Sequence, residues 1–321
     1  MSSYRICAPA RIHMNLLALN NFGYRCNGGL GFAITGFDTI VVCQPWHENH
    51  VEANSNSIAK DVIGALLIFL ENVVSSLNAS VPVKITVESC PPAHTGLGSG
   101  TSLKLSIVDA VSLVNNLNLN RKEKVRLSRR GGTSGIGVNT YFDGGFVADI
   151  GVCNTGVKSA PSSLRESNDF LEPTVIVREK MPSWLIGVFL LDNVSGIAGV
   201  KEHQFFADNT PVSQVSVEAS TYHAIMGTSS AVIDNNYQVF AESIRNIQTL
   251  EWKAAEWSIQ SKEVHEAKEL LYRAGATSVG LSSFGPALYF TGDKLDLSGL
   301  EKVGVLTYSK PNNLGRVISL V

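Results

Sequence analysis

The sequence feature that most restricts the fold is a glycine-rich segment between a strand-like and a helix-like stretch. Residues 96–102 read Gly-Leu-Gly-Ser-Gly-Thr-Ser, and apolar residues with helical spacing follow from Leu103 to Val108. Glycine adopts positive φ angles readily, so the backbone N–H groups of such a segment can converge on one point. The N-terminus of the following helix adds free N–H groups and its dipole. The segment therefore predicts a phosphate or pyrophosphate site, although an ordinary tight turn would give part of the same pattern.

Composition narrows the class of protein. The chain has 321 residues, and this length suggests two domains. Its content of 44% hydrophobic and 17% charged residues indicates a folded protein. A net charge of −2 without a long basic stretch argues against a nucleic-acid partner. The five cysteines are widely spaced and lack zinc-ligand spacing, which is typical of free thiols in a reducing cytoplasm. The longest apolar window, residues 62–70, is too short to cross a bilayer, and no signal peptide is recognised, so we expect a cytoplasmic protein without membrane contact.

Hydrophobic periodicity predicts an α+β protein. The expected strands are residues 4–8, 39–43, 83–87, 146–150, 174–177, 184–191, 278–281 and 287–290. The expected helices are residues 57–78, 101–117, 122–130, 212–225, 230–247 and 262–274. Residues 154–172 are rich in Ser, Asn and Pro and have little periodicity, so we place a domain boundary there. The expected domains are a phosphate-binding domain, residues 1–160, and a second domain, residues 161–321.

Four segments resemble the GHMP kinase superfamily in order and spacing, and within it the β-ribofuranosylaminobenzene 5′-phosphate synthase branch. They are residues 9–13 continuing to 25–32, residues 94–103, residues 130–137 continuing to 143–146, and residues 282–286. The resemblance covers residues 8–290. It implies a two-domain GHMP kinase-like fold, with an N-terminal left-handed β-α-β domain, a C-terminal ferredoxin-like domain, and a cleft between them for a polyphosphate. It also implies a homodimer.

This branch is understood to transfer ribose 5-phosphate from phosphoribosyl pyrophosphate to a ring carbon of an aromatic acid, with release of pyrophosphate and carbon dioxide. The implied acceptor is p-aminobenzoate or a carboxylated azole of C-nucleoside biosynthesis, and Mg²⁺ is expected but ATP is not. The main alternative is an ATP-dependent small-molecule kinase of the same superfamily. Such kinases typically carry a catalytic base in a Ser-Gly-x-Asp stretch, whereas this chain has glycine at the matching Gly137. Some of these kinases lack the base, and Asp143 or Asp149 could replace it. A catalytically silent binding protein is the third possibility.

The resemblance also suggests which residues form the site. Arg11 and His13 are expected to contact a phosphate or the acceptor carboxylate, Asn27 the ribose hydroxyls, and Glu202 either Mg²⁺ or an amino group. Phosphoribosyl pyrophosphate is expected to contact three loops, namely His94, Gly96, Leu97, Gly98, Ser99, Gly100, Thr101 and Ser102; Arg130, Thr133, Ser134 and Gly135; and Ser282, Ser283 and Phe284. The hydroxyls of Ser99 and Thr101 are candidate Mg²⁺ ligands.

The chain departs from the synthase branch at two positions. Asn27 and Ala18 stand where the relatives tend to carry aspartate. The absence of an acidic side chain at both positions predicts an altered acceptor pocket, and it favours a carboxylated heterocycle as the acceptor. Outside the site, we expect Trp252 and Trp257 to be core residues because they lie at helical spacing, and we expect His203 to pack.

Overall fold

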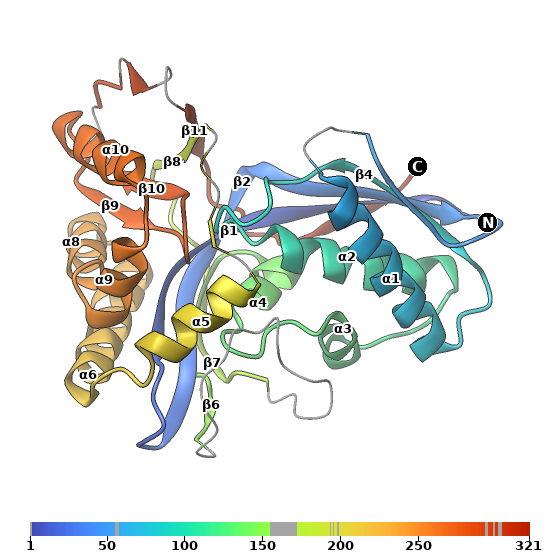
Figure 1. Ribbon diagram of the computed structural model, residues 1–321, viewed down its shortest axis with the longest axis horizontal. Coiled ribbons are helices and arrows are strands. Elements are labelled where there is room, and N and C mark those ends of the chain that lie inside the picture. The colour runs from blue at the N-terminus through green and yellow to red at the C-terminus, as the bar shows by residue number, and fades with distance from the viewer. Residues whose placement is uncertain are drawn as a thin grey trace.

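The computed structural model describes every residue except 1, 55–57, 155–171, 193, 195, 198, 293–294, 298 and 301–303. Its described part contains two β-sheets flanked by helices (Figure 1). The larger sheet is built from β12 (Val317–Leu320), β1 (Tyr4–Ala18), β2 (Arg25–Pro45), β4 (Val83–Ser89) and β3 (His50–Ala53), in that order. Further along β2 it also includes β5 (Phe146–Asp149), β6 (Val152–Cys153) and β7 (Val175–Glu179). The smaller sheet has the order β11 (Gly304–Ser309), β8 (Ile186–Leu191), β10 (Leu288–Thr291) and β9 (Ser278–Leu281).

Strands β1 and β2 are much longer than the sequence predicted. The expected strands were residues 4–8 and 39–43 only, but most of the segment between them is also paired strand. The glycines of this segment serve close approach rather than chain reversal. A Cβ on Gly31 would lie 2.2 Å from the carbonyl oxygen of Ile12, and one on Gly29 would lie 2.9 Å from Ser134 Oγ. The long strand pair thus passes directly beneath the loop that holds Ser134.

Helices cover one face of the larger sheet. They are α1 (Lys60–Leu77), α2 (Ser99–Val114), α3 (Arg121–Ser128) and α4 (Ile136–Asp143). Helices α1 and α2 pack together on the sheet through a shared apolar core that includes Phe69, Leu70 and Ile107 (Figure 1). The predicted helices 57–78, 101–117 and 122–130 are confirmed to within a few residues. Helix α4 was missed because its first turn continues a glycine-rich stretch that looked like loop.

The helices in the second half of the chain are divided into shorter segments than predicted. The expected helix 212–225 is α6 (Gln214–Tyr222) followed by a π-helical turn (His223–Ser229), and the expected helix 230–247 is α7 (Ser230–Ile233) and α8 (Tyr237–Ile247). Helix α10 (Lys262–Arg273) agrees with its prediction. Helices α5 (Val200–Asn209) and α9 (Glu251–Ser258) and strands β3, β6, β11 and β12 were not predicted.

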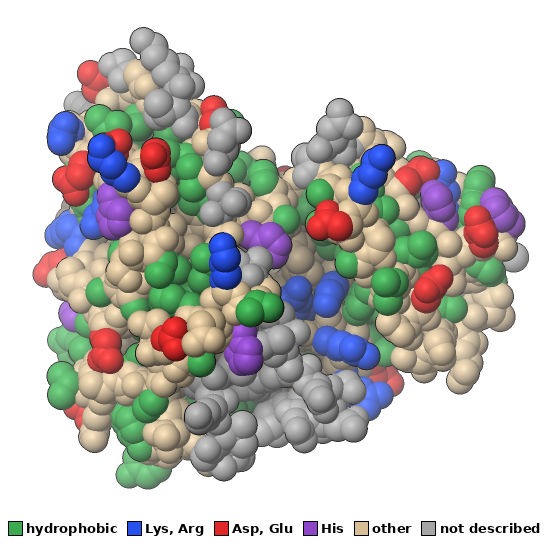
Figure 2. Space-filling view, in the orientation of Figure 1, with side chains coloured by type: hydrophobic (Ala, Val, Ile, Leu, Met, Phe, Trp, Pro, Cys, Tyr) green, Lys and Arg blue, Asp and Glu red, His purple; other side chains and the backbone are tan. Residues whose placement is uncertain are grey.

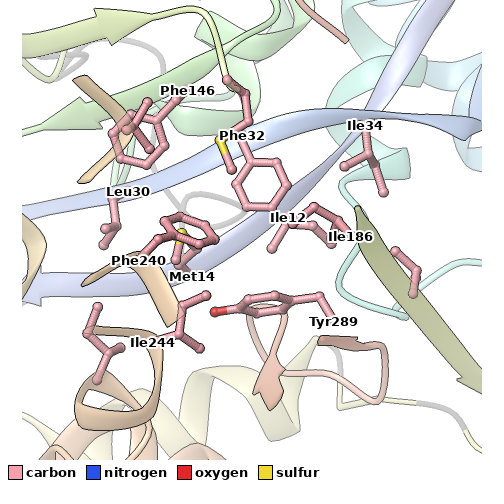
Figure 3. Close-up of a cluster of buried hydrophobic side chains, with 14 of the residues drawn as sticks. Ile12, Met14, Leu30, Phe32, Ile34, Phe146, Ile186, Phe240, Ile244 and Tyr289 are labelled. Carbon is pink, nitrogen blue, oxygen red and sulfur yellow. The ribbon is translucent and has the colours of Figure 1, made fainter. Parts of the chain in front are cut away.

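One apolar core joins the two sheets. The ring of Phe32 in β2 makes edge contacts with Phe240 of α8 and Tyr289 of β10, at centroid distances of 6.4 and 6.5 Å (Figure 3). Successive side chains of β10 point to opposite faces, so Tyr289 joins this core while Phe290 packs on the other face with Leu271 of α10. The predicted boundary between residues 160 and 161 lies outside the described residues. The last strand, β12, pairs with β1 and thus adds an edge to the larger sheet.

The α+β prediction is confirmed by these two sheets and their helices. In the described part of the chain, no helix combines the length and apolar character that a membrane crossing needs. The homodimer and the cytoplasmic location stay predictions.

Candidate active site

A cavity of about 160 Å³ lies where β1, the start of α2, the loop before α4, helix α5 and the loop after β9 meet. Its lining residues are Arg11, His13, Leu16, Thr101, Arg130, Gly131, Thr133, Ser134, Gly137, Val138, Glu202, Phe206, Ser283 and Phe284. Nine of the residues predicted for the site are among them. Lys and Arg side chains gather beside the central hollow of the molecular surface (Figure 2).

The other predicted residues are not part of this lining. They are Asn27, His94, Gly96, Leu97, Gly98, Ser99, Gly100, Ser102, Gly135 and Ser282. Residues 96–100 and Ser102 belong to the glycine-rich loop and the first turn of α2, whose main-chain N–H groups lie at the helix N-terminus. Of the two candidate Mg²⁺ ligands, Thr101 lines the cavity, whereas Ser99 is buried and does not.

The glycine-rich loop is shaped by two left-handed residues. Gly96 and Gly98 both have φ of 85°, and a Cβ on Gly96 would lie 2.0 Å from the carbonyl oxygen of Ser282. Gly98 is the N-cap of α2, and no described side chain caps this helix. The N–H groups of Thr101 and Ser102 donate to the carbonyl oxygen of Gly98, whereas those of Ser99 and Gly100 have no partner among the described residues and can bind an anion.

Two half-buried arginine side chains lie at this helix terminus. Arg11 donates from Nη1 to the carbonyl oxygen of Gly96 at 2.5 Å, and a Cβ on Gly100 would lie 3.1 Å from Arg130 Nη2. The Nε atoms of both arginines are buried and have no hydrogen-bond partner among the described residues. Burial, and then the charge of Arg130, lower the pKa of Arg11 to about 10. The cavity thus holds two guanidinium groups against the single carboxylate of Glu202, so its net positive charge favours an added anion.

Lys104, one turn into α2, adds to this charge. Burial and the charges of Arg130 and Arg129 lower the pKa of its ammonium group to about 8. Its Nζ lies 5.0 Å from the centre of the Phe69 ring. A bound polyanion would raise this pKa again, because an opposite charge favours the protonated amine.

His13 and Ser134 form a hydrogen-bonded pair in the wall of the cavity. His13 Nε2 lies 3.1 Å from Ser134 Oγ, and burial followed by the charges of Arg11 and Lys253 holds the pKa of the imidazole well below its usual range. Behind them, Asp149 accepts hydrogen bonds from the N–H groups of Gly135 and Gly151 at 2.9 and 3.0 Å. Burial raises the pKa of Asp149 to about 7. This carboxylate fixes the loop before α4, and it does not line the cavity.

Hydrogen bonds hold the loop after β9 in place from two sides. Ser282 Oγ donates to the carbonyl oxygen of Gly96 at 2.7 Å and accepts from the His13 N–H at 3.1 Å. On the far side, Lys253 donates to the carbonyl oxygen of Leu281 at 2.9 Å and pairs with Glu256, and both side chains are buried. Sequence reasoning missed this pair, because its i, i+3 spacing is equally typical of a solvated helix face.

Aromatic side chains form another wall. Phe206 and Phe284 line the cavity with ring centroids 5.6 Å apart, and Trp252 packs behind Phe206 at 4.9 Å. The prediction that Trp252 and Trp257 are core residues is confirmed, because both are buried. The prediction that His203 packs is wrong, because this residue is exposed.

The two positions that depart from the synthase branch are neighbours. Ala18 and Asn27 lie opposite each other in the β1–β2 pairing. Asn27 has φ of 65° and is 1% exposed, and neither polar atom of its side chain has a hydrogen-bond partner in the described part of the chain. The two changes therefore alter one place in the sheet, and Asn27 is not part of the cavity lining.

Comparison with known proteins gives relatives over the whole chain. The profile of the GHMP kinases N-terminal domain matches residues 60–147. A beta-ribofuranosylphenol 5′-phosphate synthase from Methanocaldococcus jannaschii is 30% identical, covering 98% of this chain and 99% of the relative. A protein of the same name from Methanothermobacter thermautotrophicus is 29% identical, covering 90% and 88%.

Solved structures agree on the fold. The structure of homoserine kinase from Cytophaga hutchinsonii superimposes with a TM-score of 0.68 over 99% of this chain and 98% of that chain, at 15% identity. At this identity the likeness concerns the fold alone, and it confirms the predicted GHMP kinase-like architecture. From the sequence match together with the cavity at the start of α2, the chain belongs to the GHMP kinase superfamily, in the branch of the beta-ribofuranosylphenol 5′-phosphate synthases.

Proposed function

We propose that this enzyme is a phosphoribosyl pyrophosphate-dependent C-ribosyltransferase that joins ribose 5-phosphate to a ring carbon of an aromatic carboxylic acid. The observation that carries the proposal is the pair of half-buried arginines, Arg11 and Arg130, whose Nε atoms are buried without a hydrogen-bond partner among the described residues at the uncapped N-terminus of α2. A diphosphate that leaves from a sugar gains negative charge in the transition state. Fixed N–H groups and guanidinium groups stabilise that charge most effectively in a site that excludes water.

The residues divide into a donor side and an acceptor side. The N–H groups at the start of α2 with Arg11 and Arg130 would bind the pyrophosphate, and Thr133 and Ser134 with the loop before α4 would bind the 5-phosphate. The ring of the acceptor would lie against Phe206 and Phe284. Because a ring carbon is a weak nucleophile, holding it close to the anomeric carbon would supply a large part of the rate enhancement.

We expect Mg²⁺ to bind together with the pyrophosphate. The described residues contain no cluster of three or more His, Cys, Asp or Glu side chains that could hold a metal. This donor set fits Mg²⁺ that is held chiefly by phosphate oxygens and water, with few protein ligands. The Thr101 hydroxyl lines the cavity and is the residue placed to complete such a site, where the cation would supply charge neutralisation.

The names of the relatives indicate the general chemical class of the acceptor. Those relatives are named for a ribofuranosylphenol product, which favours an aromatic acid with a ring hydroxyl over p-aminobenzoate. The neighbouring changes at Ala18 and Asn27 are the reason to keep a carboxylated azole as a further candidate. The proposal is therefore an aromatic or heteroaromatic carboxylate with a donor group on the ring.

The alternative is an ATP-dependent kinase, and the positions of the carboxylates count against it. Asp143 lies on the surface between Arg121 and Arg178, and Asp149 is buried behind the loop before α4. Neither lines the cavity, and a Cβ on Gly137 would be 3.4 Å from Thr101 rather than in open space. The residues suggested as replacement bases are thus out of reach of a substrate hydroxyl there.

The direct test is to incubate the protein with phosphoribosyl pyrophosphate, Mg²⁺ and a panel of aromatic acids. Mass spectrometry should detect a ribosylated adduct that has lost the carboxylate. Calorimetry should give heat for phosphoribosyl pyrophosphate and none for ATP. Turnover of ATP onto an alcohol would establish the kinase instead, and absence of binding to either would favour a silent binding protein.

A Gly98→Asp variant is expected to lose binding of phosphoribosyl pyrophosphate. A Cβ at this position would lie 3.0 Å from Arg11 Cγ, so the new carboxylate would pair with Arg11 and repel the pyrophosphate. Gly98→Asn is the matched control, because it has the same size and the same positive φ but no charge. Calorimetry should show binding abolished by aspartate and only weakened by asparagine. Equal affinities of the two variants would contradict this placement of the pyrophosphate.

A further inference from the structure

Glu202 is the one carboxylate among the described residues that line the cavity. It lies in the first turn of α5, is half-buried, and makes no hydrogen bond or ion pair with the described part of the chain. Burial raises the pKa of its carboxyl group, and the charge of Arg130 opposes this rise. A carboxylate here repels any pyrophosphate bound by Arg11 and Arg130, so its position calls for a ligand group that carries a proton or a positive charge.

An acidic residue in the first turn of a helix has an ordinary explanation, which is a favourable interaction with the helix dipole. That interaction is available to an exposed side chain and does not account for its burial in a cationic cavity. The position of Glu202 relative to the aromatic wall is more informative. Glu202 and Phe206 are four residues apart, so they lie on the same face of α5, and both line the cavity. The carboxylate is thus placed at the edge of the surface that suits an aromatic ring.

We propose that Glu202 accepts the proton of a hydroxyl, amino or ring N–H group of the acceptor, and thereby activates the ring carbon that attacks the ribose. This inference rests on the proposed function, since it assigns a task within that reaction. It also defines the acceptor class: an aromatic carboxylate whose proton-bearing group is conjugated with the carbon that carries the carboxylate.

The step balances for an acceptor with a hydroxyl group para to its carboxylate. Glu202 takes the hydroxyl proton, and the electron pair left on oxygen is delocalised into the ring. The ring carbon para to this oxygen, which carries the carboxylate, then forms the bond to the anomeric carbon. The bond from the anomeric carbon to pyrophosphate breaks, and its electron pair leaves with the pyrophosphate. The bond to the carboxylate then breaks, carbon dioxide leaves, and that electron pair restores the aromatic ring. Glu202 returns the proton to the resulting phenolate, so its own protonation is unchanged after one turnover.

Two features of the site suit this task. Burial raises the pKa of the carboxyl group, which makes the carboxylate a better proton acceptor than an exposed one. Arg130 contributes charge close to both Glu202 and the start of α2, so it can stabilise a forming phenolate and a departing pyrophosphate in the same pocket. His13 is less suited to be the base, since its surroundings oppose protonation of the imidazole.

The test compares Glu202→Gln with Asp208→Asn, which changes an exposed carboxylate at the other end of the same helix. Rates are measured with 4-hydroxybenzoate, with fluorinated 4-hydroxybenzoates whose hydroxyl is more acidic, and with 4-methoxybenzoate. We expect Glu202→Gln to lower kcat for 4-hydroxybenzoate by roughly 100-fold to 10,000-fold, the usual range for loss of a general base. The loss should shrink as the acceptor hydroxyl becomes more acidic. Asp208→Asn should match the wild type, and the methyl ether should be inert.

Three outcomes would overturn the inference. An equal loss of rate for all hydroxylated acceptors would assign Glu202 a structural role. A rise in the Mg²⁺ concentration needed for half-maximal rate, or in the Kd for phosphoribosyl pyrophosphate, would make it a metal ligand. Unchanged turnover by Glu202→Gln would remove it from the chemistry while leaving the proposed function intact. If the wild type itself forms no adduct with any acceptor, the proposed function fails together with the inference.

Discussion

Replacement of Arg130 by glutamine is expected to weaken binding of phosphoribosyl pyrophosphate by roughly 100-fold to 20,000-fold without lowering Tm. The loss of affinity follows from the loss of two charge-assisted hydrogen bonds, each worth about 1.5–3 kcal/mol, where about 1.4 kcal/mol corresponds to a factor of ten. The stability follows from the unliganded site. Arg130 is half-buried, its buried Nε has no hydrogen-bond partner among the described residues, and burial lowers the pKa of its guanidinium group, so the folded protein gains little from its charge.

Calorimetry and thermal unfolding of the same samples measure both effects. Arg129→Gln is the matched control, because Arg129 is the preceding residue and its side chain is exposed and outside the lining of the cavity. It should bind phosphoribosyl pyrophosphate nearly as the wild type does. A large drop in Tm for Arg130→Gln would show that Arg130 is a structural residue. Unchanged affinity would show that the pyrophosphate binds elsewhere.

The expectation that removal of this binding residue does not lower stability has a simple reason. A site for a polyanion must hold like charges together before the ligand arrives, and the cost is carried by the rest of the fold. With ligand present, the wild type should be the more stable of the two proteins. At saturating phosphoribosyl pyrophosphate, the wild type should unfold at a higher temperature than Arg130→Gln, since binding to the native state alone raises stability in proportion to the logarithm of ligand concentration over Kd.

The sequence could predict the parts of this site that depend on local backbone chemistry. The glycine-rich loop and the helix after it lie within a few residues of each other, so their spacing alone indicated an anion site at Gly98. Arg11, Arg130 and Glu202 come from three distant segments, and their meeting in one cavity was suggested by family resemblance rather than by any local pattern. The buried pair Lys253 and Glu256 had no distinctive signal, because burial is a property of the packed protein and not of the residue type.

The same distinction explains the fold. Helices such as α1 and α10 have one apolar face, and their periodicity was sufficient to predict them. Strand β2 was predicted only at its end, because glycines at positions 28, 29 and 31 are equally typical of turns. Whether these glycines form a turn or a strand depends on the backbone beside them, such as the Ile12 carbonyl oxygen next to Gly31. That neighbour comes close only when β1 and β2 pair, so the local sequence around Gly31 does not reveal it.

Replacement of Asp109 by asparagine is expected to lower the free energy of unfolding by about 3–5 kcal/mol, the usual effect of breaking a buried charge pair. Asp109 lies in α2, is 0% exposed, and binds three groups from separate elements. It accepts a hydrogen bond from the Tyr141 hydroxyl at 2.8 Å, and pairs with Arg316 at 2.5 Å and Lys124 at 2.7 Å. Asparagine would leave two largely buried cations without a counter-charge.

Asp143 offers a control with the same chemistry in a different environment. It also pairs with two cations, Arg121 and Arg178, but about two-fifths of its side chain is exposed, 39%. Exposed pairs contribute little, so Asp143→Asn should cost less than about 1 kcal/mol. Urea unfolding of both variants measures the difference. An Arg316→Met change in the Asp109→Asn background should recover part of the loss, because it removes one of the stranded charges. Equal losses for the two aspartates would mean that burial does not set the strength of these pairs. The larger loss expected for Asp109 would show that the segment before β12 is held to the helix whose N-terminus forms the anion site.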